Sequence, residues 1–370
     1  MIDIRGATGR SGLRRFVDYA YDRNARDSRW IAPLRISEVE RLTPSKNPFF
    51  AHADVELFLA WRDGRIVGRI AAIDDRLHHQ THGDNVAMFG FFEADDEPAS
   101  RALVGAVEDW ARRRGRAAVR GPLNPSLNES AGVLIDGFDT PPMVMMPHNP
   151  REYAAYLESA GYTKVKDLFA WIWDPAPEPP AVFTKFAKRV RDKHAITLRQ
   201  LKVAEFAREV ERLREVYCSA WERNWGFVPP TADEFRRIAA ELKPIFDPRS
   251  AVVAEHDGRF VACVVAIPDV NQALAGTTGR LNPTTILRLL RRARYIDQVR
   301  LLLLGVDPAY RAAGLFPLLM VALREQLLAS PYRRVEFSWV LEDNRDVNQA
   351  AELGGARCYK RYRIYQKALA

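Results

Sequence analysis

The most informative stretch of the sequence is Leu301-Leu-Leu-Leu-Gly-Val-Asp-Pro-Ala-Tyr-Arg-Ala-Ala-Gly-Leu-Phe-Pro-Leu-Leu319. Its aliphatic run predicts a buried strand that ends at Val306, and an apolar helical pattern begins at Leu315 after a short loop of small residues. A loop of this kind, with Gly314 just before the helix, presents backbone N–H groups at the positive end of the helix dipole. The stretch therefore predicts a strand–loop–helix unit with a phosphate site, and a plain strand–turn–helix connection is the alternative.

Both halves of the chain repeat one order of elements. In each half two alternating strands flank an Asp-Gly pair, Asp63-Gly64 or Asp257-Gly258, which is a hairpin signal. The first half has expected strands at 55–62, 65–73, 85–93, 117–121 and 168–173 and helices at 99–114 and 151–160. The second half has expected strands at 196–201, 251–255, 259–267, 301–306, 335–341 and 360–366 and helices at 204–223, 315–329 and 345–353. This order predicts an α/β (α+β mixed-sheet) fold with helices on both faces, present twice.

A proline-rich segment, Asp174-Pro-Ala-Pro-Glu-Pro-Pro180, separates the two halves. Proline fixes φ and donates no hydrogen bond, so the segment predicts a stiff, extended linker. A length of 370 residues fits two domains. We therefore expect a first domain at 1–174, a linker at 175–182 and a second domain at 183–370.

The loop in the opening stretch resembles the R/Q-x-x-G-x-G/A loop of the GNAT superfamily of acyl-CoA N-acyltransferases. The matching residues are Val306, Pro308, Tyr310, Arg311, Gly314 and Leu315 with Leu318-Leu319, followed by Asn344, Gly355 and the tyrosine-rich last strand. The whole chain also resembles bacterial tandem-GNAT proteins through Asn47-Pro-Phe-Phe50, Phe89-Gly-Phe-Phe-Glu93, Gly137-Phe-Asp-Thr-Pro-Pro142 and Trp221-Glu-Arg-Asn-Trp-Gly226. Some relatives in that group are linked to bacterial sphingolipid synthesis, in which a long-chain amine is N-acylated to a ceramide.

The resemblance implies an acyl-CoA co-substrate and no metal. It implies that the second domain holds acyl-CoA through residues of the loop and its surroundings: Val306, Arg311, Ala312, Ala313, Gly314, Leu315 and Asn344. The backbone N–H of Val306 is then the expected donor to the carbonyl oxyanion. The chain departs from the family pattern at Phe316 and Pro317 in the loop, and at Ala351, where the family often has a tyrosine that protonates the thiolate.

The first half has Glu93-Ala-Asp-Asp-Glu-Pro98 where the phosphate loop is expected. Four carboxylates repel a pyrophosphate, so we expect a degenerate copy that shapes the acceptor site, with its long loop 121–150 taking part. The expected acceptor-binding residues come from both halves: Trp221, Asn224, Trp225, Asn271, Glu129 and His148. Burial that anchors a loop is the alternative interpretation of the two tryptophans.

N-acyl transfer from a thioester requires a deprotonated amine, a stabilised oxyanion and a thiolate that leaves. The catalytic candidates are Asp269 and Glu342, each at the end of an expected strand, and Tyr359 in the last strand. A turn or a helix cap is the alternative for the carboxylates, and for Asp343 we favour the cap. Strand packing is the alternative for Tyr359.

The net charge of +8 is concentrated in two windows, Phe183–His194 and Ile286–Arg300, each with five lysines or arginines against one aspartate. In both windows apolar residues recur at helical spacing among the cations. A basic amphipathic helix is typical of contact with an anionic membrane, so we expect peripheral contact through Ile286–Ile296 and Phe183–Lys193. A helix packed on its own domain is the alternative. The sequence has no recognisable nucleic-acid-binding pattern, and no nucleic acid is expected as a partner.

The remaining features exclude several classes of protein. Cys218, Cys263 and Cys358 are too far apart for a disulfide scaffold or a CxxC site. His78-His79-x-x-His82 lacks further ligands for a metal, so we expect a solvated loop there. The first residues lack the apolar segment of a secretory signal, and no run is long enough to span a membrane. We therefore expect a cytoplasmic protein, located at the inner face of the membrane if it contacts lipid.

Together these features predict an acyl-CoA-dependent N-acyltransferase that acts on a primary amine. The preferred acceptor is a long-chain sphingoid base, which gives a ceramide. The alternatives are an acetyltransferase that acts on a small or a protein amine, and a non-catalytic acyl-CoA-binding protein.

Overall fold

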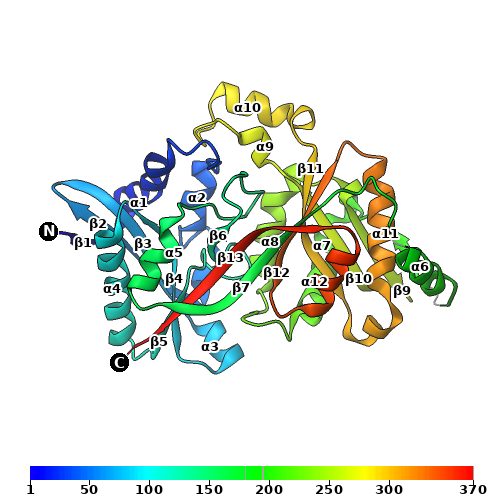
Figure 1. The fold of residues 1–370 in the computed structure, drawn as a ribbon, viewed down its shortest axis with the longest axis horizontal. Coiled ribbons are helices and arrows are strands. Elements are labelled where there is room, and N and C mark those ends of the chain that lie inside the picture. The colour runs from blue at the N-terminus through cyan, green and yellow to red at the C-terminus, as the bar shows by residue number, and fades with distance from the viewer. Residues whose placement is uncertain (180, 194–195, 370) are drawn as a thin grey trace. The chain divides into compact units, whose positions relative to one another are not determined.

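The computed structural model describes residues 1–179, 181–193 and 196–369, which form two compact units (Figure 1). Unit 1 comprises Met1–Leu168, Leu274–Leu290 and Lys360–Ala370, and unit 2 comprises Phe169–Ala273 and Arg291–Tyr359. Each unit is therefore assembled from stretches that are far apart in the sequence.

Unit 1 contains a mixed sheet with the strand order β1-β2-β3-β4-β5-β13-β7, and β6 pairs with β13. β4 pairs with β5 in parallel, whereas the β1–β2, β2–β3, β3–β4 and β5–β13 pairs are antiparallel. Its strands are β1 (Asp3–Gly6), β2 (Ala53–Arg62), β3 (Arg65–Asp75), β4 (Val86–Ala94), β5 (Ala118–Gly121), β6 (Val133–Asp136), the first part of β7 (Thr163–Trp173) and most of β13 (Arg357–Ala368). Its helices are α1 (Gly9–Asn24), α2 (Arg35–Arg41), η1 (Pro48–Ala51), α3 (Arg76–His82), α4 (Glu97–Arg113), α5 (Glu152–Ser159) and α10 (Pro283–Leu290).

Unit 2 contains a mixed sheet with the order β7-β12-β11-β10-β9-β8, in which β11 and β12 run parallel. Its strands are the last part of β7, β8 (Thr197–Arg199), β9 (Ala251–His256), β10 (Arg259–Pro268), β11 (Gln298–Val306) and β12 (Arg334–Leu341). Its helices are α6 (Ala181–Lys193), η2 (Val203–Glu205), α7 (Phe206–Trp221), α8 (Ala232–Leu242), η3 (Lys243–Ile245), η4 (Pro248–Ser250), α9 (Asn271–Leu274), η5 (Arg292–Arg294), η6 (Pro308–Ala313), α11 (Leu315–Leu328) and α12 (Arg345–Leu353). The predicted mixed α/β fold is confirmed in both units.

Both predicted Asp-Gly hairpins are confirmed, as β2–β3 and as β9–β10. Asp63 and Gly64 have φ angles of 51° and 77°, and Asp257 and Gly258 have φ angles of 49° and 73°. Positive φ at both central residues defines the type I′ turn, whose twist matches that of the two strands it joins. Glycine at the second position makes this geometry accessible without strain.

Helices cover both faces of the unit 2 sheet. On one face, buried residues that alternate along β9 and β10 pack against α11 and α6: Val252, Ala254, Val264, Ala266, Leu315, Leu318, Leu319, Ala187 and Val190. On the other face α7 approaches β11 closely, because a Cβ at Gly305 would lie 3.2 Å from the Cβ of Ala220. The end of α7 and the start of α11 therefore lie near the carboxyl end of β11.

The proline-rich segment is fixed to unit 2 by a side chain of α11. The guanidinium of Arg324 donates to the carbonyl oxygens of Pro175 at 2.9 Å, Ala176 at 3.1 Å and Pro177 at 3.1 Å. Pro180 lies outside the described residues. The segment has no regular secondary structure, as its prolines predict, but it is held in place along α11 rather than standing free.

The strand predicted to close the second half pairs with strands of unit 1. Tyr365 of β13 lies opposite Gly121 of β5, and Tyr362 lies opposite Leu134 of β6. β7 likewise begins in unit 1 and ends in unit 2. Alternation of apolar residues predicts that a segment is a strand but does not indicate which strand it pairs with. The pairing of β13 with strands of unit 1 was therefore not predictable from the sequence.

The prediction of a single helix over Ile286–Ile296 is wrong. α10 ends at Leu290, and Arg292–Arg294 form a separate 3₁₀ turn. Ile296, predicted to share an apolar face with Leu290, is buried, whereas Leu290 is exposed. The chain passes from unit 1 to unit 2 between Leu290 and the next residue, so the helical periodicity is interrupted there.

Among the described residues, no helix is both long enough and apolar enough to cross a bilayer. All three cysteines are free thiols, and burial raises the pKa of Cys263 to about 12. A buried thiol that stays protonated is a poor nucleophile, so Cys263 is a core residue.

Candidate active site

The site begins where β11 and β12 stop pairing. Their parallel ladder runs from Gln298 to Leu301 on β11, whereas β11 itself continues to Val306. Leu302 is an extra residue in the β10–β11 ladder and forms a β-bulge directly after the last parallel pair. Open α/β sheets bind ligands beyond the carboxyl ends of their strands, and bulges are frequent beside active sites because they redirect backbone groups.

The last residues of β11 direct backbone groups away from β10. Val306 lies opposite Ala262, and the N–H of Asp307 donates to the carbonyl of Val261 at 2.8 Å. Val306 and Ala262 therefore form a non-hydrogen-bonded pair of the antiparallel ladder, and the N–H of Val306 points to the side of β12. The N–H of Val306 therefore faces away from β10, and its role as a donor to the carbonyl oxyanion stays a prediction.

The predicted phosphate loop is a 3₁₀ turn followed by a left-handed glycine. Asp307 accepts a hydrogen bond from the N–H of Ala309 at 2.9 Å and starts the turn, which ends at Ala313. Gly314 has φ +76° and is the N-cap of α11, where no side chain caps the helix. The first N–H groups of α11 are therefore available to an anion, except at Pro317. The side chain of Ala312 lies outside the described part of the chain.

Two hydrogen bonds tie the end of α7 to this loop and to β11. Arg311 donates to the carbonyl of Ala220 at 2.9 Å, and Trp221 Nε1 donates to the carbonyl of Leu304 at 3.1 Å. Arg311 remains exposed, so its remaining N–H groups can reach a phosphate. Asn224 follows in a turn in which its N–H donates to the Trp221 carbonyl at 2.8 Å. The structure thus brings Trp221, Asn224 and Arg311 together, with Trp225 next along the chain.

The basic helix α6 packs beside the same loop. Ala187 and Val190 are buried in the core of unit 2, and a Cβ at Gly314 would lie 3.4 Å from Cγ2 of Val190. The cations of α6 whose side chains are described are all exposed: Lys185, Lys188 and Arg189. The side chains of Phe186 and 191–193 and the whole of residue 194 lie outside the described part of the chain. α6 is therefore a helix packed on its own unit with a cationic outer face.

A buried polar network lies beside the end of the β11–β12 ladder and was missed in the sequence. Arg300 and Glu336 are directly opposite each other and are 1% and 0% exposed. Arg300 Nε donates to Ser338 Oγ at 2.7 Å, and Ser338 and Tyr359 both donate to the Glu336 carboxylate. A charged residue inside an otherwise apolar strand was the available signal, at 300 and at 336. Tyr359, a predicted catalytic residue, is part of this network.

Two other predicted residues are at the opposite end of β11. Asp269 is buried just after β10, where its N–H donates to the carbonyl of Gln298 at 2.9 Å and its carboxylate accepts from Asn271 N–H at 3.3 Å. Pro268 pairs with Val299 at the start of β11, so about 25 Å of strand separates Asp269 from the phosphate loop. The structure therefore does not bring Asp269 and Asn271 together with the loop.

Glu342 and Asn344 lie at the same edge of the sheet as Val306, because β11 and β12 are parallel. Asn344 is the N-cap of α12 and accepts a hydrogen bond from the N–H of Val347 at 3.4 Å. The cap expected at Asp343 thus lies one residue further on. The carbonyl of Glu342 accepts from Asn348 Nδ2 at 3.4 Å, which fixes the backbone at the carboxylate.

Glu129 and His148 belong to unit 1. Glu129 is buried and pairs with Arg41 at 3.3 Å. His148 Nε2 contacts Asp27 Oδ2 at 2.9 Å, its side chain is 3% exposed, and burial lowers its pKa. A neutral, carboxylate-paired imidazole is compatible with binding an ammonium group or with a structural role, so both residues stay candidates.

In unit 1 the strands β4 and β5 have the arrangement of β11 and β12 in unit 2. Residues Leu123 and Asn124 of unit 1 itself, however, occupy the position beside the end of β4. β4 pairs in parallel with β5 over Val86–Met88, and a bulge with φ +51° at Phe91 follows. Leu123 N–H donates to the Phe89 carbonyl at 2.8 Å, and Phe91 N–H donates to Asn124 Oδ1 at 2.5 Å. A Cβ at Gly90 would lie only 1.7 Å from the Leu123 carbonyl oxygen. The backbone groups that β11 offers to a ligand are satisfied internally in β4.

The acidic stretch in unit 1 also has internal partners. Asp96 caps α4 by accepting from Ala99 N–H at 3.0 Å, and Arg62 binds both of its carboxylate oxygens at 2.7 and 2.8 Å. Glu93 is buried, accepts from Tyr153 Oη at 2.8 Å, and has a pKa raised by burial. Carboxylates thus occupy the position that an anionic ligand would need.

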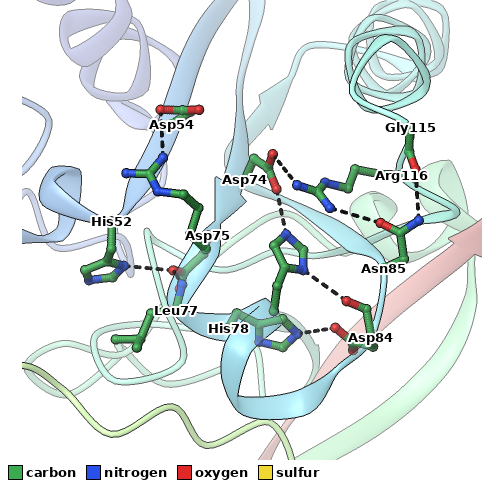
Figure 2. A network of polar contacts seen from close by, with 12 residues as sticks. His52, Asp54, Asp74, Asp75, Leu77, His78, Asp84, Asn85, Gly115 and Arg116 are labelled. Carbon is green, nitrogen blue, oxygen red and sulfur yellow. Dashed lines mark hydrogen bonds and ion pairs between the residues drawn. The ribbon is translucent and has the colours of Figure 1, made fainter.

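The three neighbouring histidines are not in a solvated loop, which corrects that expectation. They lie on the short helix α3, where His78 contacts Asp84 at 2.8 Å and His79 contacts Asp74 at 2.7 Å (Figure 2). Arg116 also donates to Asp74, at 2.9 Å. Burial lowers the pKa of His78 to about 4. Within the described residues no cluster of His, Cys, Asp and Glu is arranged to hold a metal.

Comparison with known proteins places these features in a family. The chain is 41% identical to the bacterial ceramide synthase of Caulobacter vibrioides over 365 residues, covering 96% of this chain and 95% of that protein. It is 36% identical to the protein YghO of Escherichia coli K12, covering 99% and 95%. A search with protein-family models gave no match.

Solved structures share the fold. A tandem GNAT protein from the clavulanic acid biosynthesis pathway aligns with a TM-score of 0.59 at 16% identity, over 100% of this chain and 99% of that one. A GCN5-related N-acetyltransferase from Sphaerobacter thermophilus aligns with a TM-score of 0.50 at 13% identity, over 100% and 96%. The fold is therefore that of the tandem-GNAT proteins. The chain belongs to the family of the bacterial ceramide synthase, as its full-length similarity shows.

Proposed function

We propose that this acyltransferase moves an acyl group from acyl-CoA to the primary amine of a long-chain base and so forms a ceramide. The observation that carries the donor assignment is the start of α11, where Gly314 leaves the helix N-terminus open at the end of β11. The observation that favours the acceptor is the 41% identity to a bacterial ceramide synthase along almost the whole chain.

In this proposal the pyrophosphate of CoA binds the first N–H groups of α11, with Arg311 and the cations of α6 beside it. The pantetheine arm runs back along the β12-facing edge of β11, where the N–H of Val306 donates to it. Because that arm is long and extended, the thioester lies several residues back, near the bulge at Leu302. Ala312, Ala313 and Leu315 are the loop and helix residues that we assign to this CoA site, and Asn344 caps the start of α12 at the same edge.

We further propose that the two units have different roles. Unit 2 binds acyl-CoA, and unit 1 is a degenerate copy that contributes to the acceptor site through Glu129 and His148. The internal bonds of Leu123 and Asn124 and the capped helix at Asp96 support the loss of CoA binding in unit 1. Trp221, Asn224 and Trp225 at the end of α7 are the acceptor residues of unit 2.

A lipid acceptor requires access to a membrane, and α10 offers a surface for it. Four apolar side chains on and just before this helix are exposed: Leu281 (50%), Ile286 (44%), Leu287 (47%) and Leu290 (75%). Arg280 precedes them and Arg291, Arg292 and Arg294 follow in the chain. Apolar side chains next to arginines are the pattern of peripheral contact with anionic lipid, and we assign that contact to α10 rather than to α6.

A thiol-release assay tests the proposed function. The protein is mixed with acetyl-, medium-chain or long-chain acyl-CoA and with sphinganine or a polyamine, and free CoA and the N-acyl product are measured. The proposal expects release that depends on sphinganine and forms a ceramide. CoA release only with acetyl-CoA and the polyamine would show that the acceptor is a small amine and not a long-chain base. No CoA release with any combination of donor and acceptor would overturn the proposed activity on these substrates.

A further inference from the structure

The imidazole of His148 in unit 1 has one nitrogen with a partner and one without. Its Nε2 contacts Asp27 Oδ2 at 2.9 Å, and its side chain is 3% exposed. Its Nδ1 is buried and makes no hydrogen bond to any residue that the structure describes. Leaving a buried polar atom unpaired costs free energy, so an atom of this kind in a native protein requires an explanation.

The chemistry of the Asp27–His148 pair determines what the second nitrogen can do. Asp27 also accepts from the N–H of Arg29 at 2.9 Å, and although burial acts in the opposite direction, these partners hold the pKa of Asp27 below its ordinary value. An ionised carboxylate has no proton to donate, so the N–H of the imidazole is at Nε2. Burial lowers the pKa of His148, which keeps the ring neutral at pH 7.5. Nδ1 is therefore a lone pair that accepts.

Two cations of unit 1 fix a neighbouring loop through its carbonyl groups. Lys360 Nζ donates to the carbonyl of Thr140 at 2.7 Å, and Arg29 Nε donates to the carbonyl of Asp139 at 3.1 Å. Both carbonyls belong to the segment Gly137-Phe-Asp-Thr-Pro-Pro142. This loop is therefore held from two sides by residues that are distant in the sequence.

The same two cations show that the loop lies close to His148. After burial, the charges of Lys360 and Arg29 also act to lower the pKa of the imidazole, which requires that both are near it. Thr140 Oγ1 is a second buried polar atom that has no hydrogen-bond partner among the described residues. One cluster of unit 1 thus contains two unpaired polar atoms, of which His148 Nδ1 accepts and Thr140 Oγ1 can donate or accept.

The charges around this cluster select the chemistry of its ligand. Lys360 and Arg29 repel an ammonium group, whereas Asp27 is already paired with His148. A neutral hydroxyl meets no such repulsion, and its O–H is the donor that an unpaired imidazole nitrogen requires. In N-acyl transfer the amine itself has to stay free to attack the thioester, so a neighbouring hydroxyl is the suitable group to hold.

We propose that His148 Nδ1 and Thr140 Oγ1 bind the hydroxyl groups next to the amine of the acceptor, with Asp27 as the positioning residue that fixes the imidazole. The inference rests on the proposed N-acylation of a long-chain base. It defines the substrate class more narrowly, as a long-chain amine with hydroxyl groups beside the amine.

His79 is a matched control within unit 1. Its Nε2 contacts Asp74 Oδ1 at 2.7 Å, as His148 contacts Asp27, but its Nδ1 also has a partner, the Asp84 carbonyl at 3.0 Å. Glutamine replaces the Nε2 of a histidine with an amide nitrogen and has no atom in place of Nδ1. His148→Gln therefore retains the donor to Asp27 and removes the proposed acceptor, while His79→Gln makes the same exchange where both nitrogens are already used.

The test measures kcat/KM for CoA release with two acceptors, sphinganine and 2-aminooctadecane, which lacks both hydroxyl groups. We expect the wild type to prefer sphinganine at least about tenfold, because an amine without hydroxyls leaves a buried acceptor unpaired. His148→Gln is expected to bring the ratio close to one, and His79→Gln to leave it as in the wild type. A general loss of stability lowers both activities together and does not change their ratio.

Thr140→Val supplies a second variant, since valine has the shape of threonine without its hydroxyl, and we expect it to reduce the ratio as well. No preference for sphinganine in the wild type, or an unchanged preference in His148→Gln, would overturn the inference. If His148→Gln does not fold, an unchanged preference in Thr140→Val overturns the assignment of that side chain, and the wild-type ratio still tests the hydroxyl requirement. Absence of CoA release with either acceptor in the wild type would overturn the proposed function instead.

Discussion

Asp96 and Gly314 hold the same position in the two units, the N-cap of the helix that follows a bulged strand. Asp96 donates no proton but accepts one hydrogen bond from Ala99 N–H and two from Arg62. Gly314 has no side chain, so among the described residues the N-cap of α11 contributes no carboxylate to this helix end. One residue type at one position thus separates a closed helix end from one that is open to an anion.

The first prediction follows from that pair. Gly314→Asp places a carboxylate at the N-terminus of α11, where it occupies the site of the pyrophosphate and repels it. We expect KM for acyl-CoA to rise at least about 30-fold, since a charge-assisted contact contributes about 2 kcal/mol. The CoA-release assay measures KM, and calorimetry measures the corresponding loss of affinity for CoA.

Gly314→Asn is the matched control for this substitution. Asparagine has the size of aspartate and tolerates the left-handed conformation at φ +76°, but it carries no charge. We expect a much smaller rise in KM than with aspartate. Equal losses in the two variants would assign the effect to the added side chain and not to its charge, and would contradict the anion site.

The second prediction concerns the closed helix end of unit 1. Asp96→Ala removes the cap of α4 and the partner of Arg62, and loss of an N-cap costs about 1 kcal/mol. We therefore expect the free energy of unfolding to fall by about that amount, measured by urea denaturation. KM for acyl-CoA is expected to stay unchanged, because unit 1 binds no CoA in the proposal. A marked rise in KM would show that unit 1 takes part in donor binding.

Local patterns allowed the elements of the fold to be predicted, but not their pairing. The Asp-Gly turns, the apolar run before Val306 and the glycine at 314 each determine a local conformation, and all three are confirmed. The placement of β13 in unit 1 depends on which partner buries its apolar face. That choice is made between segments more than 200 residues apart, on which a local pattern carries no information.

The candidate site was predictable where it depends on backbone and not where it depends on buried charge. A small-residue loop before a helix can be recognised in the sequence, because only small residues allow the backbone to approach a phosphate. Glu336 and Arg300 were overlooked because a charge in a strand normally faces solvent. Their register in the ladder, which sequence spacing does not contain, is what brings them together.

The third prediction is a loss of stability in mild acid that depends on His78. Burial lowers its pKa from 6.5 to about 4, so the unfolded chain takes up a proton at this residue before the folded one does. The stabilisation is present above pH 6.5 and is lost as the pH falls from 6.5 towards 4. The difference amounts to about 3 kcal/mol at most.

Urea unfolding of the wild type and of His78→Gln at pH 7.5 and pH 4.5 measures this contribution. We expect the stability difference between the two pH values to be smaller in the variant by about 1 to 3 kcal/mol. His256→Gln in unit 2 is the control for the substitution of a histidine by glutamine, and that side chain is 31% exposed. The same pH dependence in wild type and His78→Gln would show that other groups cause the loss.

The fourth prediction tests the exposed apolar side chains of α10. Changing Ile286 and Leu290 together to Asp adds two negative charges and removes the two side chains that would enter a lipid interface. We expect co-sedimentation with vesicles containing phosphatidylglycerol to fall at least about tenfold. Val203→Asp is the control, because Val203 is also an exposed apolar side chain (44%) and belongs to the other unit.

The lipid composition separates the two forces that act at this surface. Arg280, Arg291 and Arg294 are exposed and attract anionic lipid, whereas apolar insertion also operates on neutral phosphatidylcholine. Wild-type binding is therefore expected to be stronger with phosphatidylglycerol and to weaken as salt screens the charges. Activity on sphinganine presented in vesicles should fall together with binding in the α10 variant, while activity on a short-chain, water-soluble amine should not. Retained vesicle binding in that variant would remove α10 from the proposed route of the acceptor.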